Sequence, residues 1–142
     1  MSFREVLQDE LRRRCARNPR YSLRAFARAL ALDHSSLSQL LRGRRRVTTR
    51  AIRRIGATLR LSAHEIEIHC AEENDAALLR VVGTELFRAD SRRLASVLGI
   101  PIDEVNVSLQ RLLRFRALSM TAAGHWEVSN AQSRRAVADH RP

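Results

Sequence analysis

Short apolar repeats at helical spacing, each bounded by a capping or breaking signal, constrain the fold of this chain more than any other feature. Phe3, Leu7 and Leu11 lie on one face of a stretch that predicts an amphipathic helix over residues 3–16. Asn18-Pro19 should end that helix, because a residue that precedes proline is disfavoured in the helical conformation. The N-terminus is therefore predicted to be one helix followed by a turn.

Capping residues mark four more short helices before residue 70. A Ser, Thr, Asp or Asn side chain at the N-cap accepts hydrogen bonds from the first free amides of a helix. Gly43 is placed to close one of these helices. Ser62-Ala63-His64-Glu65 is a capping box. The predicted helices are residues 23–30 after Ser22, residues 34–42 after Asp33, one beginning at Thr48 or Thr49, and one after Ser62.

The composition also favours helices. Glycine and proline number only 5 and 3, aromatic side chains make up 4% of the chain, and leucine, alanine and arginine dominate. The predicted fold class is mainly all-α, with a five-helix domain over residues 1–72 and a small module with a short β-hairpin over residues 76–129. Residues 130–142 lack apolar periodicity and are predicted to be a flexible tail.

The second half carries weaker signals in a recognisable order. The polar stretch Glu72-Glu73-Asn74-Asp75 predicts a junction between the two modules. The elements predicted after it are a helix carrying Leu78, Leu79, Val82, Leu86 and Phe87, a short helix from Asp90-Ser91 to Gly99 with Leu94, Val97 and Leu98 inward, a helix over 103–115 with Val105, Leu109, Leu112 and Leu113 inward, and a hairpin of Ala117–Met120 with Trp126–Val128 around Ala123-Gly124.

The positive charge is concentrated in the first half. Residues 1–70 contain 16 arginines and 6 acidic residues, a net charge of +10, whereas residues 71–142 contain 10 and 9, a net charge of +1. The chain has no lysine, and a GC-rich genome would explain arginine in place of lysine but not this asymmetry. A basic module joined to a neutral one predicts a polyanionic partner for the first half.

The same residues carry a resemblance. The run SLRAFARALALDHSSLSQLLRGRRRVTTRAIRRIGATLRLSAHEI resembles the Cro/C1-type (XRE-like, lambda-repressor-like) helix-turn-helix in Ala27, in Leu32, and in Gly43 before its basic residues. Leu37 and Leu40 match the apolar anchors of the second helix. Ala31 departs from the pattern, since glycine is usual at this turn, and a Cβ in a left-handed conformation costs roughly 1 kcal/mol.

This resemblance implies sequence-specific binding of double-stranded DNA by a transcriptional regulator. Helix 34–42 would enter the major groove while helix 23–30 lies across the backbone. Gln39 can pair with adenine, and Arg42 can reach guanine or phosphate. The predicted base-reading residues are His34, Ser35, Ser38, Gln39 and Arg42, and the predicted phosphate-binding residues are Arg24, Arg44, Arg45, Arg46 and Arg50. The alternative to DNA binding is a solvated helix face whose C-terminal arginines only interact favourably with the helix dipole.

The second module resembles the winged-helix modules of bacterial regulators. The resemblance lies in the segment DSRRLASVLGIPIDEVNVSLQRLLRFRALSM and the Trp126 that follows it. A second DNA face would use Asn106, Gln110, Arg111 and Arg114. Asp103 and Glu104 oppose it, because two carboxylates at that helix end repel phosphates. Dimerisation or contact with another protein is the favoured role of this module.

The sequence contains few features that would support an enzyme, a metal site or an RNA-binding protein. It contains no phosphate-binding glycine loop and no GxSxG, HExxH or CxxC motif, so an enzyme is not expected. Cys15 and Cys70 lack further ligands at zinc-binding spacing, so neither a metal nor a cofactor is expected. The single Trp and Tyr leave few platforms for stacking RNA bases.

The expected partners are double-stranded DNA and a second copy of the chain, because one helix-turn-helix reads only a few base pairs. The rival hypothesis is a helix-turn-helix protein that acts by protein contact, either antitoxin-like or bound to a sigma factor or polymerase. The uniform basic charge of the first half argues against it. Neither a signal peptide nor an apolar membrane segment is evident, which predicts a cytoplasmic protein.

Overall fold

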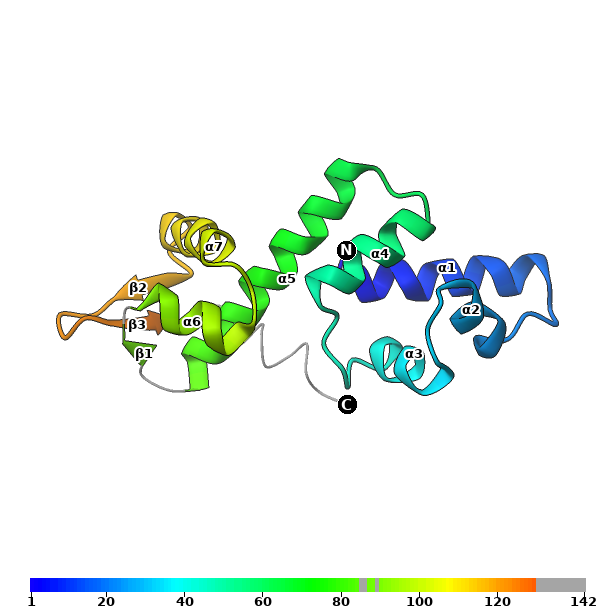
Figure 1. The fold of residues 1–142 in the computed structure, drawn as a ribbon, viewed down its shortest axis with the longest axis horizontal. Helices are drawn as coiled ribbons and strands as arrows, with labels where there is room; N and C mark the ends of the chain where they lie inside the picture. The colour runs from blue at the N-terminus through cyan, green and yellow to red at the C-terminus, as the bar shows by residue number, and fades with distance from the viewer. Residues whose placement is uncertain (85–86, 89, 130–142) are drawn as a thin grey trace. The chain divides into compact units, whose positions relative to one another are not determined.

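The computed structural model describes residues 1–84, 87–88 and 90–129, and in them the chain forms seven helices and a small antiparallel sheet (Figure 1). It divides into two compact units, one over residues 1–70 and one that begins at Ala71. The predicted mainly helical class is confirmed. The predicted tail, residues 130–142, lies outside the described residues. None of the helices in the described residues has the length and apolar character that a membrane crossing requires.

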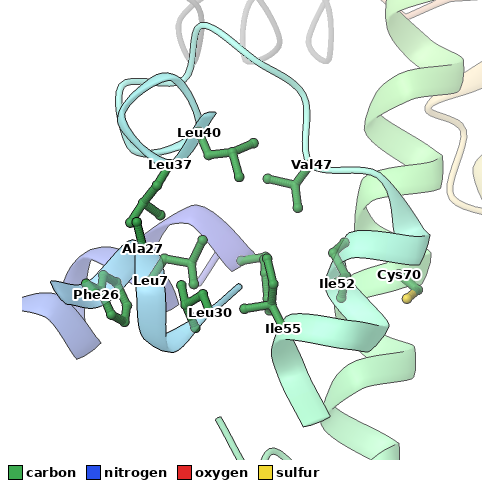
Figure 2. Packing of buried hydrophobic residues seen from close by; sticks show 11 residues of the cluster. Leu7, Phe26, Ala27, Leu30, Leu37, Leu40, Val47, Ile52, Ile55 and Cys70 are labelled. Carbon is green, nitrogen blue, oxygen red and sulfur yellow. The ribbon is translucent and has the colours of Figure 1, made fainter. Parts of the chain in front are cut away.

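The first unit is built from α1 (Phe3–Arg17), α2 (Leu23–Ala29), α3 (His34–Leu41), α4 (Thr49–Thr58) and the start of α5 (Ala63–Thr84). Each of these helices contributes to one apolar core, in which α3 packs on both α1 and α2. Figure 2 shows most of the core, whose buried members are Phe3, Leu7, Phe26, Ala27, Leu30, Leu37, Leu40, Val47, Ile52, Ile55 and Cys70.

The predicted caps are present. The side chains of Ser22, Asp33 and Thr48 each accept a hydrogen bond from the amide three residues on, at the starts of α2, α3 and α4. The Ser62 and Glu65 side chains bond to each other's backbone amides, as a capping box requires. Local capping chemistry therefore sets where these helices begin.

The turn between α2 and α3 is left-handed at Ala31, the position where the resembled pattern usually has glycine. Ala31 has a φ of +54°, and its neighbour Leu32 donates its amide to the Ala27 carbonyl. Arg60 and Arg116 have φ of +59° and +55° at the ends of α4 and α7. Three helix ends in the described residues therefore place a side chain where glycine is favoured.

Ala31→Gly is expected to stabilise the first unit by roughly 0.5–1 kcal/mol, because it removes the Cβ strain at positive φ at a smaller cost in chain entropy. Urea unfolding followed by circular dichroism measures the change. The control is Ala57→Gly on α4, where glycine should destabilise by about 1 kcal/mol. Destabilisation by Ala31→Gly would mean that the turn carries no such strain.

The second unit comprises the rest of α5, then α6 (Ser91–Leu98), α7 (Ile102–Arg114) and a three-stranded sheet. Strand β3 (His125–Val128) lies between β1 (Phe87–Arg88) and β2 (Leu118–Met120), antiparallel to both. The predicted hairpin is β2–β3, and Asp90 caps α6 with Gly99 left-handed at its end. The buried core comprises Leu78, Val82, Leu94, Val105, Leu109, Leu112, Ala117, Leu118 and Trp126.

The boundary between the two units falls between Cys70 and Ala71, next to the predicted junction at residues 72–75, but the predicted break in the chain is absent, because α5 continues through it. Asn74 is buried and donates to Glu104 Oε2 at 3.0 Å. Asp75 accepts hydrogen bonds from the Ser108 hydroxyl and from Arg111. The polar residues that suggest a linker in the sequence thus bind α7, so the helix has no reason to end there.

Three predictions of inward-facing or helical residues also fail. Phe87 lies in β1 and pairs with Trp126, because α5 ends one residue after Gly83, a poor helix former. Leu86, predicted in the same helix, lies outside the described residues. Val97 and Leu113 are 56% and 38% exposed, because one narrow face of each short helix suffices to cover this small core.

Candidate nucleic-acid interface

Helix α3 presents one face to the core and the opposite face to solvent. Leu37 and Leu40 are buried against α1 and α2, as Figure 2 shows. Asp33 begins the helix as its N-cap. Since consecutive residues turn by about 100° around a helix axis, Ser35, Gln39 and Arg42 point away from the side of α3 that carries Leu37 and Leu40.

The five predicted base-reading residues all lie on the outward side of α3 or at its ends. Ser35, Gln39 and Arg42 are exposed and follow one another at spacings of four and three, so they share one face. Ser38 lies beside them and is half-buried, and His34 is exposed at the start of the helix. The structure therefore brings a hydroxyl, an amide and a guanidinium together on one exposed helix face.

The N-terminus of α3 carries a hydrogen-bonded chain that ends on an arginine. Asp33 accepts from the Ser36 amide at 3.0 Å and from the Ser36 hydroxyl at 2.6 Å. The Ser36 hydroxyl oxygen accepts from Nη1 of Arg45 at 2.9 Å. These bonds from Ser36, first through its hydroxyl and then through its amide, lower the pKa of Asp33, so the carboxylate stays charged. Arg45 is thus held beside the helix start.

The arginine loop is attached to α3 through the backbone. Gly43 takes the left-handed conformation at φ +71°, and the Arg44 and Arg45 amides both donate to the Gln39 carbonyl, at 2.9 and 3.3 Å. Of the predicted phosphate-binding residues in this loop, Arg44 and Arg45 are exposed and Arg46 is half-buried. One residue of the outward face, Gln39, therefore also fixes the start of the loop.

The acidic residues of the first unit are engaged away from this face, Asp33 excepted. Within the described residues no carboxylate pairs with Arg24, Arg42, Arg44 or Arg50, all of which are exposed. The six acids and their partners are Glu5 with Ser2, Asp9 with Arg12, Glu10 with Arg13 and Arg14, Asp33 with Ser36, Glu65 with Ser62, and Glu67 with Arg53. Exposed arginines without a carboxylate partner among the described residues therefore include those of α3, its following loop, and the first turns of α2 and α4; others lie elsewhere in the unit, at Arg17, Arg20, Arg28, Arg54 and Arg60.

The candidate face on α7 is smaller than predicted. Asn106, Gln110 and Arg114 are exposed. Arg111 instead forms a two-pronged ion pair with Asp75, with both nitrogen–oxygen distances at 2.7 Å. The hydrogen bond to Asp75 raises the pKa of Arg111, and the guanidinium is committed to packing α7 on α5.

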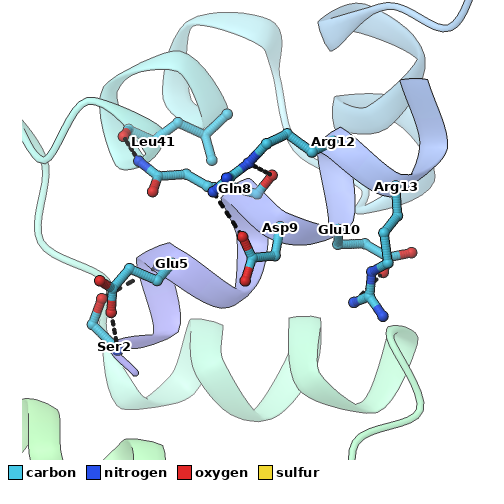
Figure 3. Close-up of polar contacts among 8 residues, drawn as sticks. All are labelled: Ser2, Glu5, Gln8, Asp9, Glu10, Arg12, Arg13 and Leu41. Atoms are coloured by element: carbon cyan, nitrogen blue, oxygen red, sulfur yellow. Dashed lines mark hydrogen bonds and ion pairs between the residues drawn. The ribbon is translucent and has the colours of Figure 1, made fainter. Parts of the chain in front are cut away.

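Two polar residues of the first unit were not predicted from the sequence. Ser36 faces the helix start and joins Asp33 to Arg45. Gln8 on α1 donates from Nε2 to the Leu41 carbonyl at 2.8 Å (Figure 3). The capping preference of Asp33 could have indicated Ser36, three residues on. No local pattern indicates Gln8, whose partner is 33 residues away.

The described part of the chain brings no three His, Cys, Asp or Glu side chains together in a group that could hold a metal ion. Cys70 is buried, and its thiol lies 3.8 Å from the Thr49 carbonyl. No family model, curated protein or solved structure matches the chain. The resemblances of the two sequence segments to known families therefore stay predictions.

Proposed function

We propose that the protein is a sequence-specific, double-stranded DNA-binding transcriptional regulator. In this proposal the five helices of the first unit form a Cro/C1-type, lambda-repressor-like domain in which α2 and α3 are the helix-turn-helix. The packing of α2 on α3 and the left-handed turn at Ala31 between them support this assignment. Helix α3 would enter the major groove, and this function would require the protein to be in the cytoplasm, where a bacterial chromosome lies.

One observation carries the proposal. The exposed face of α3 joins side chains that can read bases to arginines that no carboxylate in the described residues neutralises. Gln39 would pair with adenine and Arg42 with guanine or phosphate. Arg24, Arg44 and Arg50 would bind phosphates and supply affinity without sequence information.

We propose that the second unit, a winged-helix-like module, contacts a protein, with a second copy of the chain as the first candidate. Large apolar side chains remain exposed on it, and Phe115, Val107 and Val97 are 72%, 56% and 56% exposed. Asp103 and Glu104 occupy the first turn of α7, where they would repel phosphates. A homodimer would match a two-fold related DNA site.

Gln39→Ala is expected to relax the preference at one base pair by about 1–3 kcal/mol while leaving non-specific binding unchanged, because the amide contacts a base edge and carries no charge. Duplexes selected by the wild-type protein from a random pool provide the probe. Mobility shifts of the selected duplex and its single-base variants measure the change. Thr58→Val on α4 is a neutral control.

The outcomes separate the hypotheses. An equal loss on every duplex would remove Gln39 from base reading. A wild-type protein that binds no duplex even at low salt would contradict the proposed function and favour the rival, a helix-turn-helix protein that acts by protein contact. A palindromic consensus would support the homodimer.

A further inference from the structure

The C-terminal end of α3 is held by a side chain from another helix. The last carbonyls of a helix lack partners within it and must find them elsewhere. Backbone amides at the helix end and in the following loop satisfy the carbonyls of Ser38, Gln39 and Leu40. The carbonyl of Leu41 instead accepts from Nε2 of Gln8 on α1 at 2.8 Å, in a half-buried bond (Figure 3).

A second side chain of α1 reaches the same place. Arg4 lies one turn before Gln8, and residues four apart share a helix face. A Cβ built on Gly43 would collide with Nη1 of Arg4, so the guanidinium lies against the Gly43 backbone. Leu7, between them in sequence, is fully buried in the core. The N-terminal half of α1 is therefore anchored and holds α3 where the arginine loop begins.

The residues that would read DNA lie close to this attachment. Gln39 and Arg42 are two residues before and one residue after Leu41. A shift of the Leu41 backbone must move both, because they belong to the same last turn. On the premise of the proposed function, such a shift would misplace their side chains against base edges.

We propose that Gln8 is a positioning residue for sequence-specific DNA binding. It acts through the Leu41 carbonyl, which fixes the last turn of α3 and with it the reach of Gln39 and Arg42. The role of Gln8 differs from that of the arginines, since it supplies geometry and no charge. Its loss should therefore lower specificity while the salt dependence stays the same.

The test uses the full-length chain with Gln8→Met, which keeps the side chain's length and removes its donor. Its probes are a duplex selected by the wild type from a random pool and a shuffled duplex of equal composition. Affinity for the selected duplex should fall about tenfold, the effect of one hydrogen bond, and affinity for the shuffled duplex less than twofold. Gln8→Lys restores a hydrogen-bond donor and should therefore restore most of the affinity ratio between the two duplexes. Its added positive charge raises the affinity for both duplexes and so does not change this ratio.

A matched control and a double-mutant cycle separate positioning from stability. Thr58→Val also deletes a side-chain bond to a main-chain carbonyl, that of Arg54 on α4, and should leave the affinity ratio unchanged. All variants are compared at a temperature where circular dichroism shows them folded. On a Gln39→Ala or an Arg42→Ala background the tenfold effect of Gln8→Met should shrink, to threefold or less on at least one of the two, because Gln8 positions both side chains.

Three results would overturn the proposal in distinguishable ways. Equal losses on both duplexes would make Gln8 a structural residue only. A full tenfold loss on both the Gln39→Ala and the Arg42→Ala background would mean that Gln8 acts independently of the α3 face. A wild-type protein with no preference among duplexes would overturn the proposed function, and the role of Gln8 would fall with it.

Discussion

Replacing both Arg44 and Arg50 with glutamine is expected to weaken binding to every duplex by about 100-fold at moderate salt. Each exposed guanidinium is free of carboxylate partners among the described residues, so each can bind a phosphate at full charge. A hydrogen bond to a charged group contributes about 1.5 kcal/mol or more, which is roughly tenfold in affinity for each arginine. The plot of log affinity against log salt concentration should lose about 1.8 units of slope, since each lost phosphate contact removes about 0.9.

The matched control removes the same charge from α1. Arg12 and Arg13 pair with Asp9 and Glu10 at 2.7 and 2.8 Å, as Figure 3 shows. Changing both to glutamine lowers the net charge equally but leaves the α3 face intact. Titrations by fluorescence anisotropy over a salt series compare the two pairs. An equal loss of slope for both would show that net charge alone, without a defined phosphate site, attracts the DNA.

Leu37→Ala is expected to destabilise the first unit by about 2–5 kcal/mol, because it removes a fully buried side chain and leaves a cavity. Leu37 anchors α3 in the core, so the loss falls on the helix proposed to read DNA. At roughly 0.05–0.15 kcal/mol per residue, a unit of this size has about 4–10 kcal/mol of stability in total. The variant should therefore lose a large part of the unit's stability and unfold at a much lower denaturant concentration.

The chain provides its own reporters for this experiment. It has one tyrosine and one tryptophan, and Tyr21 belongs to the first unit while Trp126 is buried in the second. In Leu37→Ala the circular dichroism and Tyr21 signals should shift to lower denaturant, while the Trp126 transition stays in place. Gln39→Ala, on the exposed side of the same helix, should shift neither. A Trp126 transition that moves with the others would show that the two units unfold together.

The parts of the fold that follow from local chemistry could be predicted from the sequence. Ser22, Asp33 and Thr48 cap their helices because a short polar side chain next to free amides bonds to them whatever lies further away. The left-handed turn at Ala31 has a different source, the resemblance to a pattern in which glycine is usual at this position. The outward face of α3 follows from the positions of Leu37 and Leu40, its buried residues.

The parts of the fold that depend on partners far away in the sequence could not be predicted. Asn74 and Asp75 have the composition of a linker, and only their partners Glu104 and Arg111, some 30 residues on, make them a buried and a half-buried residue of α5. The same pairing removes Arg111 from the predicted second DNA face. The role of Gln8 could not be predicted for a related reason. A lone polar residue on an amphipathic helix does not indicate which carbonyl it will bind.

The residues in left-handed conformation at the helix ends should affect the rate at which the protein is degraded in a cell. Ala31 and Arg60 each add about 1 kcal/mol of strain to the first unit, together enough to raise its unfolded fraction roughly 30-fold. Cellular proteases degrade the transiently unfolded chain, so this fraction sets the rate of turnover. The strain at these helix ends should thereby lower the amount of protein in the cell. Single substitutions to glycine at these positions should raise that amount without changing the face proposed to bind DNA.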